Sequence, residues 1–127
     1  MWVRFQPNPC GRGNVGDCVV RALSAALHID WESAFLMLCD SAFQMCDMPS
    51  GNSVLSAIMR KNGFYRMSLP STCPDCYSIS DFCREYPQGI YVLGTGSHVV
   101  CVIDGDYYDS WDSGEEIPQY LFYKKGD

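Results

Sequence analysis

The spacing of apolar residues changes near the middle of the chain, and this change constrains the fold more than any other feature. From residue 18 to residue 61 the apolar residues recur at helical spacing, whereas most runs beyond residue 63 are short and rich in β-branched and aromatic residues. Helices followed by strands predict a single α+β domain, residues 1–127, whose N-terminal helices pack on a C-terminal antiparallel sheet. The predicted helices span 18–28, 31–46, 52–61 and 78–86, and the predicted strands span 64–69, 89–93, 98–103, 106–111 and 119–123.

A two-residue hairpin turn is predicted at Asp104-Gly105, which separates two β-rich runs. With this turn, alternate side chains on the paired strands face the same side, so His98 and Asp109 share one face of the sheet. Asp112 then points to the other side, and a one-residue bulge in the hairpin would exchange the two carboxylates. The sequence therefore predicts Asp109 beside His98, with Asp112 as the alternative.

Cys18 begins the most apolar of the predicted helices, directly after a loop rich in proline, glycine and asparagine. Asp17 is predicted to cap this helix through its carboxylate. A thiol in the first helical turn lies among unpaired backbone N–H groups at the positive end of the helix dipole. This setting lowers the pKa of the thiol and favours the reactive thiolate, so Cys18 is the candidate nucleophile.

The chain contains two histidines, and only one of them is placed to act together with Cys18. His28 lies ten residues after Cys18 on the same predicted helix, about 15 Å away and too far to reach the thiol. His98 is thus the candidate general base, and Asp109 beside it would hold the ring in the required tautomer and orientation. Each of these residues alone also fits an ordinary structural role; their combination predicts a thiol-dependent active site.

A tetrahedral intermediate at such a site needs hydrogen-bond donors for its oxyanion. The usual donors are the backbone N–H of the nucleophile and a side-chain amide upstream of it. Three amide side chains precede Cys18 on the loop, namely Gln6, Asn8 and Asn14. Asn14 is close in sequence but suits the turn as well, whereas Gln6 and Asn8 have room to fold back, so all three are candidates.

Charge and composition exclude several classes of protein. The formal net charge is −6 and the basic residues are scattered, with never more than two together, which argues against a nucleic-acid partner. No apolar run approaches the roughly 20 residues of a membrane span, and no signal peptide is recognisable. A cytoplasmic protein without a membrane partner is therefore expected.

The eight cysteines are expected to be reduced, because the chain is long enough to build a core and carries no recognisable export signal. Cys73 and Cys76 form a CxxC pair, which suits a redox centre or half of a zinc site. The pair follows three predicted helices instead of the first strand of a βαβ unit, and no second pair has suitable spacing. No metal and no cofactor are therefore expected, and a thiol-redox protein that uses this pair is the less favoured alternative. The cysteines lie at positions 10, 18, 39, 46, 73, 76, 83 and 101.

The order of the candidate residues resembles that of papain-like cysteine peptidases in their minimal form. It is similar to bacteriocin-processing peptidases and to small uncharacterised bacterial and phage proteins with comparable helices and hairpins. The resemblance spans nearly the whole chain, and its specific parts are residues 16–23 (GDCVVRAL) and 97–113, which contain HVV and YDSWD. It implies a papain-like fold and a hydrolase that cleaves peptide or isopeptide bonds in a peptide or protein substrate.

Carried over residue by residue, the resemblance implies that Cys18 is the nucleophile, His98 the base and Asp109 the residue that orients it. In the papain family a glutamine about six residues before the cysteine helps to stabilise the oxyanion, and Arg12 occupies that position here. The oxyanion donor therefore stays open among the upstream amides. The main alternative is a non-catalytic interaction module on the same fold.

Overall fold

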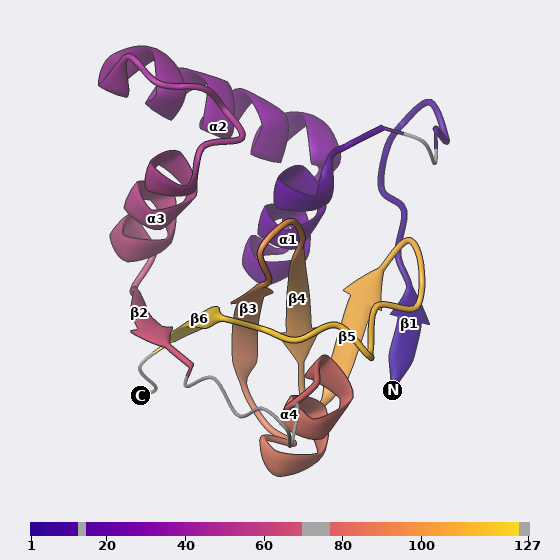
Figure 1. Cartoon of the computed structure of the whole chain (residues 1–127). Helices are drawn as coiled ribbons and strands as arrows, with labels where there is room; N and C mark the ends of the chain where they lie inside the picture. Colours follow the sequence, from indigo (N-terminus) through magenta and orange to yellow (C-terminus); the bar gives the residue numbers. More distant parts are fainter. Residues whose placement is uncertain (13–14, 70–76, 125–127) are drawn as a thin grey trace.

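The computed structural model describes residues 1–12, 15–69 and 77–124, and within them it shows four helices and one six-stranded sheet (Figure 1). The predicted α+β class is confirmed. The predicted helices and strands are present, with shifts of one or two residues at their ends. In chain order the elements are β1 (Trp2–Arg4), α1 (Cys18–Leu27), α2 (Trp31–Met45), α3 (Asn52–Lys61), β2 (Phe64–Ser68), α4 (Ile79–Glu85), β3 (Ile90–Gly94), β4 (Val99–Ile103), β5 (Asp106–Asp109) and β6 (Tyr120–Lys124).

The sheet is mixed, with the strand order β1-β5-β4-β3-β6-β2. Every neighbouring pair is antiparallel except β1 and β5, which run parallel. The C-terminal strands β2 to β6 thus pair antiparallel, as predicted, and the parallel edge is added by β1, an N-terminal strand that was not predicted. The three residues of β1 carry almost no local strand pattern; they form a strand because β5, near the other end of the chain, supplies their backbone partners.

Helices cover both faces of the sheet (Figure 1). α1 lies against one face, where it packs with Val99 and Cys101 of β4, and α2 and α3 extend this layer. α4 lies on the other face, where Phe82 packs with Val100 and Val102. Successive residues of β4 thus point to opposite sides, as the period of a strand requires. β4 is consequently held firmly between two halves of the core.

The hairpin between β4 and β5 has the predicted turn. Asp104 and Gly105 have φ values of 50° and 81°, and both lie in the left-handed region that a type I′ turn requires. Ile103 pairs with Asp106, which is the predicted register. The start of β4 and the end of β5 therefore lie at the same end of the sheet.

Two helices begin with side-chain caps. Asp30 accepts a hydrogen bond from the backbone N–H of Ser33 (2.7 Å) at the start of α2, and Ser78 forms a reciprocal capping box with Asp81 at the start of α4. The predicted cap of α1 is wrong, because the carboxylate of Asp17 makes no capping hydrogen bond. It binds side chains instead, as described below.

Six cysteines fall within the described residues, and all six are free thiols. The CxxC pair, Cys73 and Cys76, lies outside the described residues. In the ranges that the structure describes, no group of three or more His, Cys, Asp or Glu side chains is placed to hold a metal ion. Within the same ranges, no helix combines the length and the apolar character needed to cross a membrane.

Candidate active site

Cys18, His98 and Asp109 meet at one end of the sheet. Cys18 is the first residue of α1, His98 immediately precedes β4 and Asp109 is the last residue of β5. Nε2 of His98 lies 2.5 Å from Oδ2 of Asp109, and the thiol of Cys18 lies close enough to the same imidazole ring for each of these two groups to shift the pKa of the other. Because Nε2 faces Asp109, Nδ1 is the ring nitrogen left for Cys18. The imidazole therefore lies between the candidate nucleophile and a carboxylate.

The three side chains differ in their exposure to solvent. Asp109 is 1% exposed and His98 is 9% exposed, whereas Cys18 is half-buried. The indole of Trp111 covers the imidazole, with 5.0 Å between the ring centroids. The His98–Asp109 pair is thus shielded from water, while the thiol remains within reach of a reagent or a substrate.

Asp112, the alternative partner of His98, does not reach the imidazole. Its Oδ1 accepts hydrogen bonds from the hydroxyl of Tyr107 and from the backbone N–H of Gly114, the latter at 3.2 Å. The alternative is therefore wrong. The physical reason is that the predicted register holds through the hairpin and Asp112 turns toward Tyr107.

Several groups act on the ionisation of Cys18. Burial alone would raise its pKa, but hydrogen bonds from His98 and from the backbone N–H of Val99 lower it, as do the positive charges of His98 and Arg21. The net effect is a pKa below the ordinary thiol value, which favours the thiolate. The position of Cys18 at a helix start predicted this direction, and His98, Val99 and Arg21 are the specific groups that lower the pKa.

The pKa of His98 is raised, in the opposite direction to that of Cys18. Burial alone would lower its pKa, but hydrogen bonds with Asp109 and Cys18, and attraction to their negative charges, raise it to about 9. Burial likewise works against ionisation of Asp109, yet the hydrogen bonds from His98 and Ser113 hold the pKa of this carboxyl below its usual value. Both shifts therefore favour a thiolate beside an imidazolium over the neutral pair.

We expect the imidazole of His98 to titrate near pH 9 in the folded protein, well above its ordinary pKa of 6.5. NMR of the ring protons measures the midpoint, and His28→Gln assigns the second histidine. Because the folded-state pKa is raised, the stability contributed by charged His98 is complete below pH 6.5 and is lost as the pH rises through about 9. Cys18→Ala should lower the midpoint, since it removes the thiolate. A midpoint at or below 6.5 in the wild-type protein would contradict the ion pair.

Asp109 accepts hydrogen bonds from four donors, two of which are side chains that the sequence analysis missed. Oδ2 accepts from His98 and from the hydroxyl of Ser113 (2.6 Å). Oδ1 accepts from the backbone N–H of Ser110 (2.8 Å) and from Nη2 of Arg21 (3.2 Å). A lone arginine in an otherwise apolar helix was a signal of a buried acidic partner, because such a charge is rarely buried unpaired. Nothing in the local sequence marks Ser113.

Among the upstream amides, Gln6 carries an unused donor. Its Nε2 is buried and has no hydrogen-bond partner within the described residues, while its Oε1 accepts from the backbone N–H of Asn8 (3.4 Å). Oδ1 of Asn8 accepts from the backbone N–H two residues further on (2.8 Å), in a local turn. Asn14 lies outside the described residues. A hydrogen bond from the N–H of Phe5 to the carbonyl oxygen of Asp109 (2.8 Å) places Gln6 beside the end of β5.

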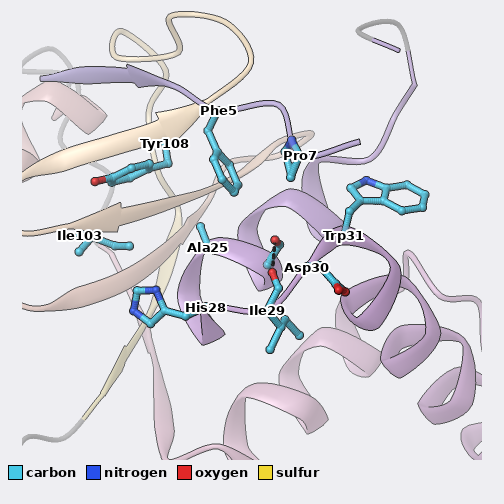
Figure 2. Close-up of a pocket in the computed structure, with 10 residues that line it drawn as sticks. Phe5, Pro7, Ala25, His28, Ile29, Asp30, Trp31, Ile103 and Tyr108 are labelled. Carbon is cyan, nitrogen blue, oxygen red and sulfur yellow. Dashed lines mark hydrogen bonds between the residues drawn. The ribbon is translucent and has the colours of Figure 1, made fainter. Parts of the chain in front are cut away.

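Two cavities of about 400 Å³ each lie near these elements. One begins at Trp111, beside the imidazole of His98, and is lined by the carboxylates of Asp112, Glu115 and Glu116. The other lies at the C-terminal half of α1. Figure 2 shows His28 and Trp31 on opposite sides of it. None of Cys18, His98 and Asp109 lines this second cavity.

The site therefore combines a thiol of lowered pKa, an imidazole of raised pKa and a buried carboxylate. This set can perform nucleophilic attack and proton transfer without a metal ion. Comparisons of the chain with protein-family models, with curated proteins and with solved structures found no match.

Proposed function

We propose that this protein is a papain-like thiol hydrolase, a cysteine peptidase or amidase that cleaves peptide or isopeptide bonds through an acyl-enzyme on Cys18. The observation that carries the proposal is the buried imidazole of His98, held between the Cys18 thiol and the Asp109 carboxylate. A papain-like fold is part of the same proposal. It is supported by a helix that begins at Cys18 and packs on the sheet that carries the other two residues.

In the first half-reaction the thiolate of Cys18 attacks the carbonyl carbon of the substrate and forms a C–S bond, while an electron pair moves to the carbonyl oxygen. When the carbonyl reforms, the C–N bond breaks and the imidazolium of His98 donates its proton to the departing amine. The products are a free amine and a thioester on Cys18. Asp109 holds Nε2 throughout, so that the proton on Nδ1 is directed at the leaving group.

In the second half-reaction water hydrolyses the thioester. Neutral His98 removes a proton from the water as its oxygen attacks the carbonyl carbon, and the C–S bond then breaks. The carboxylic acid product leaves, and Cys18 returns to a thiolate beside an imidazolium. Asp109 stabilises the positive ring that forms in this step.

Gln6 is the amide that we assign to the oxyanion in both half-reactions. Its buried Nε2 has no partner within the described residues, and such an unsatisfied donor costs about 1–3 kcal/mol until an acceptor binds. The backbone N–H of Cys18, at a helix start where N–H groups have no intrahelical acceptor, supplies the second donor. Asn8 uses its side-chain oxygen in the local turn.

We expect Gln6→Ala to lower kcat for hydrolysis by about 10²- to 10³-fold, the usual loss when one oxyanion donor is removed. Alkylation of Cys18 by iodoacetamide should stay nearly unchanged, because substitution at a saturated carbon forms no oxyanion. Asn8→Ala is the matched control and should leave both rates close to those of the wild-type protein. Equal losses of hydrolysis and alkylation in Gln6→Ala would show a disturbed site and contradict the oxyanion role.

The test of the proposed function compares the wild-type protein with Cys18→Ala, and uses Cys39→Ala, another half-buried free thiol, as the matched cysteine control. p-Nitrophenyl acetate forms acyl-enzymes without a fitted substrate, and it should acetylate Cys18 selectively, as mapped by mass spectrometry. A mixture of unstructured peptides should be cleaved by the wild-type protein and by Cys39→Ala only. Acetylation spread evenly over the cysteines, with no peptide cleaved, would favour the non-catalytic interaction module.

A further inference from the structure

We propose that Arg21 is a positioning residue whose guanidinium joins the start of α1 to the end of β5, so that Cys18 meets His98 and Asp109 in a fixed geometry. This proposal rests on the proposed function, to which it adds a residue that acts on the active site through Asp109. Four observations carry it: the place of Arg21 in the helix, its burial, its two partners and the anchoring of those partners.

Arg21 lies three residues after Cys18 on α1 and is 5% exposed. Long side chains on a helix point back toward its N-terminus, and this direction brings the guanidinium to the helix start. There Nη1 donates to Oδ1 of Asp17, and Nη2 donates to Oδ1 of Asp109 (3.2 Å). One planar guanidinium thus bridges two buried carboxylates. Asp17 directly precedes the nucleophile, and Asp109 is the residue that orients His98.

Asp17 is itself held in place, so it can anchor the guanidinium. Its Oδ2 accepts a hydrogen bond from Nε1 of Trp31 (2.9 Å) at the start of α2, and its side chain is buried. Figure 2 shows where Trp31 lies relative to α1. The side chains of Trp31, Asp17, Arg21 and Asp109 therefore form one continuous chain of hydrogen bonds from α2 to β5. This chain explains why Asp17 does not cap α1, as its oxygens are already used.

Arg21 also determines which oxygen of Asp109 faces the imidazole. Arg21 and the backbone N–H of Ser110 occupy Oδ1, which leaves Oδ2 for His98 and Ser113. Without the guanidinium, Asp17 and Asp109 would be two buried carboxylates near a thiolate, with a single imidazolium to balance them. Asp109 would then be free to turn, and the imidazole would lose its fixed orientation.

A merely structural arginine would contribute to stability and leave the titration of Cys18 unchanged in the folded protein. The experiment therefore measures the pH dependence of Cys18 alkylation by iodoacetamide, at a temperature at which circular dichroism shows each variant folded. The variants are Arg21→Met and Arg21→Lys. Leu23→Ala is the matched control, because Leu23 lies on the same helix, is 0% exposed and has no polar group in the network.

We expect the profile of Arg21→Met to move toward alkaline pH, with alkylation at pH 6 about tenfold slower, the equivalent of one pKa unit. Arg21→Lys should lie between Arg21→Met and the wild-type protein, because an ammonium group cannot bridge the two carboxylates as a planar fork does. Leu23→Ala should be less stable and yet keep the wild-type profile. Trp31→Phe removes the hydrogen bond that anchors Asp17 without changing any charge, and it should shift the profile in the same direction, about threefold at pH 6.

A wild-type pH profile of Cys18 alkylation in folded Arg21→Met would overturn the proposal. A wild-type profile in Arg21→Lys would overturn it as well, because a positive charge without the bridging geometry would then be sufficient. If Arg21→Met does not fold, Trp31→Phe decides, and an unshifted profile there overturns the proposal. The wild-type measurement separately tests the proposed function. An ordinary thiol profile in the wild-type protein counts against the thiolate–imidazolium pair, whereas a shifted wild-type profile that Arg21→Met retains counts only against Arg21.

Discussion

Replacing His98 with alanine is expected to slow the alkylation of Cys18 by iodoacetamide at pH 6 about 100-fold. In the wild-type protein, the hydrogen bond and the charge of His98 help to outweigh burial and lower the pKa of the thiol. Without the ring, burial acts with less opposition, and an ordinary thiol is only about 0.3% ionised at pH 6. The measurement is the second-order rate constant over a range of pH, with mass spectrometry to identify each modified cysteine.

His28→Ala is the matched control for this substitution. His28 is exposed and lines the separate cavity shown in Figure 2, so its loss should leave the reactivity of Cys18 unchanged. In His98→Ala, Cys18 should react no faster than the exposed Cys10 and Cys46. If Cys18 keeps its wild-type rate in His98→Ala, the pairing of thiol and imidazole is wrong and with it the proposed mechanism.

Asp109→Asn is expected to lower the free energy of unfolding by about 3–5 kcal/mol, the usual cost of breaking a buried ion pair from one side. Asp109 is 1% exposed and accepts from four donors. An amide turns its own N–H group toward some of these donors. It also removes the buried negative partner of His98 and one of the two buried negative partners of Arg21. Hydrolysis should fall as well, because the amide can stabilise the wrong tautomer of His98 and cannot stabilise the imidazolium. Urea unfolding followed by circular dichroism measures the stability loss.

Asp112→Asn is the control for this prediction, because it makes the same chemical change at an exposed carboxylate three residues away. It should cost about 1 kcal/mol or less. The difference between wild-type protein and Asp109→Asn should also shrink in acid. The pKa of Asp109 is lowered, so its contribution is complete above the ordinary value of 3.8 and is lost as the pH falls through the folded-state pKa. A stability loss no larger than that of Asp112→Asn would refute the role assigned to the network.

The pairing of His98 with Asp109 was predictable because it depends on a local pattern. The Asp104-Gly105 turn sets the register of the hairpin, and the two-residue period of a strand then places the two side chains together. The structure has this turn and this register, and Oδ2 of Asp109 lies 2.5 Å from the imidazole. His28 could be excluded as the base because the rise of a helix places it too far from Cys18.

The buried network around Arg21 was not predictable in the same way. Local capping preferences favoured Asp17 as a helix cap. Its carboxylate oxygens instead accept hydrogen bonds from Arg21, one turn further along α1, and from Trp31 of α2. The partner that completes the network, Asp109, lies 88 positions after Arg21. No sequence periodicity links residues so far apart. The parallel pairing of β1 with β5 also joins distant residues, so it was not predictable either.

Neighbouring residues in the chain are enough to predict every helix, every strand except β1 and the register of the hairpin. They also mark one thiol, one imidazole and one carboxylate as candidate site residues. Packing between distant segments, in contrast, brings Cys18 to His98, ties the helix to the strand through Arg21 and leaves Nε2 of Gln6 without a partner among the described residues. These outcomes depend on how burial is balanced against charge and hydrogen bonding between distant segments. That balance exists only once the helices have packed on the sheet.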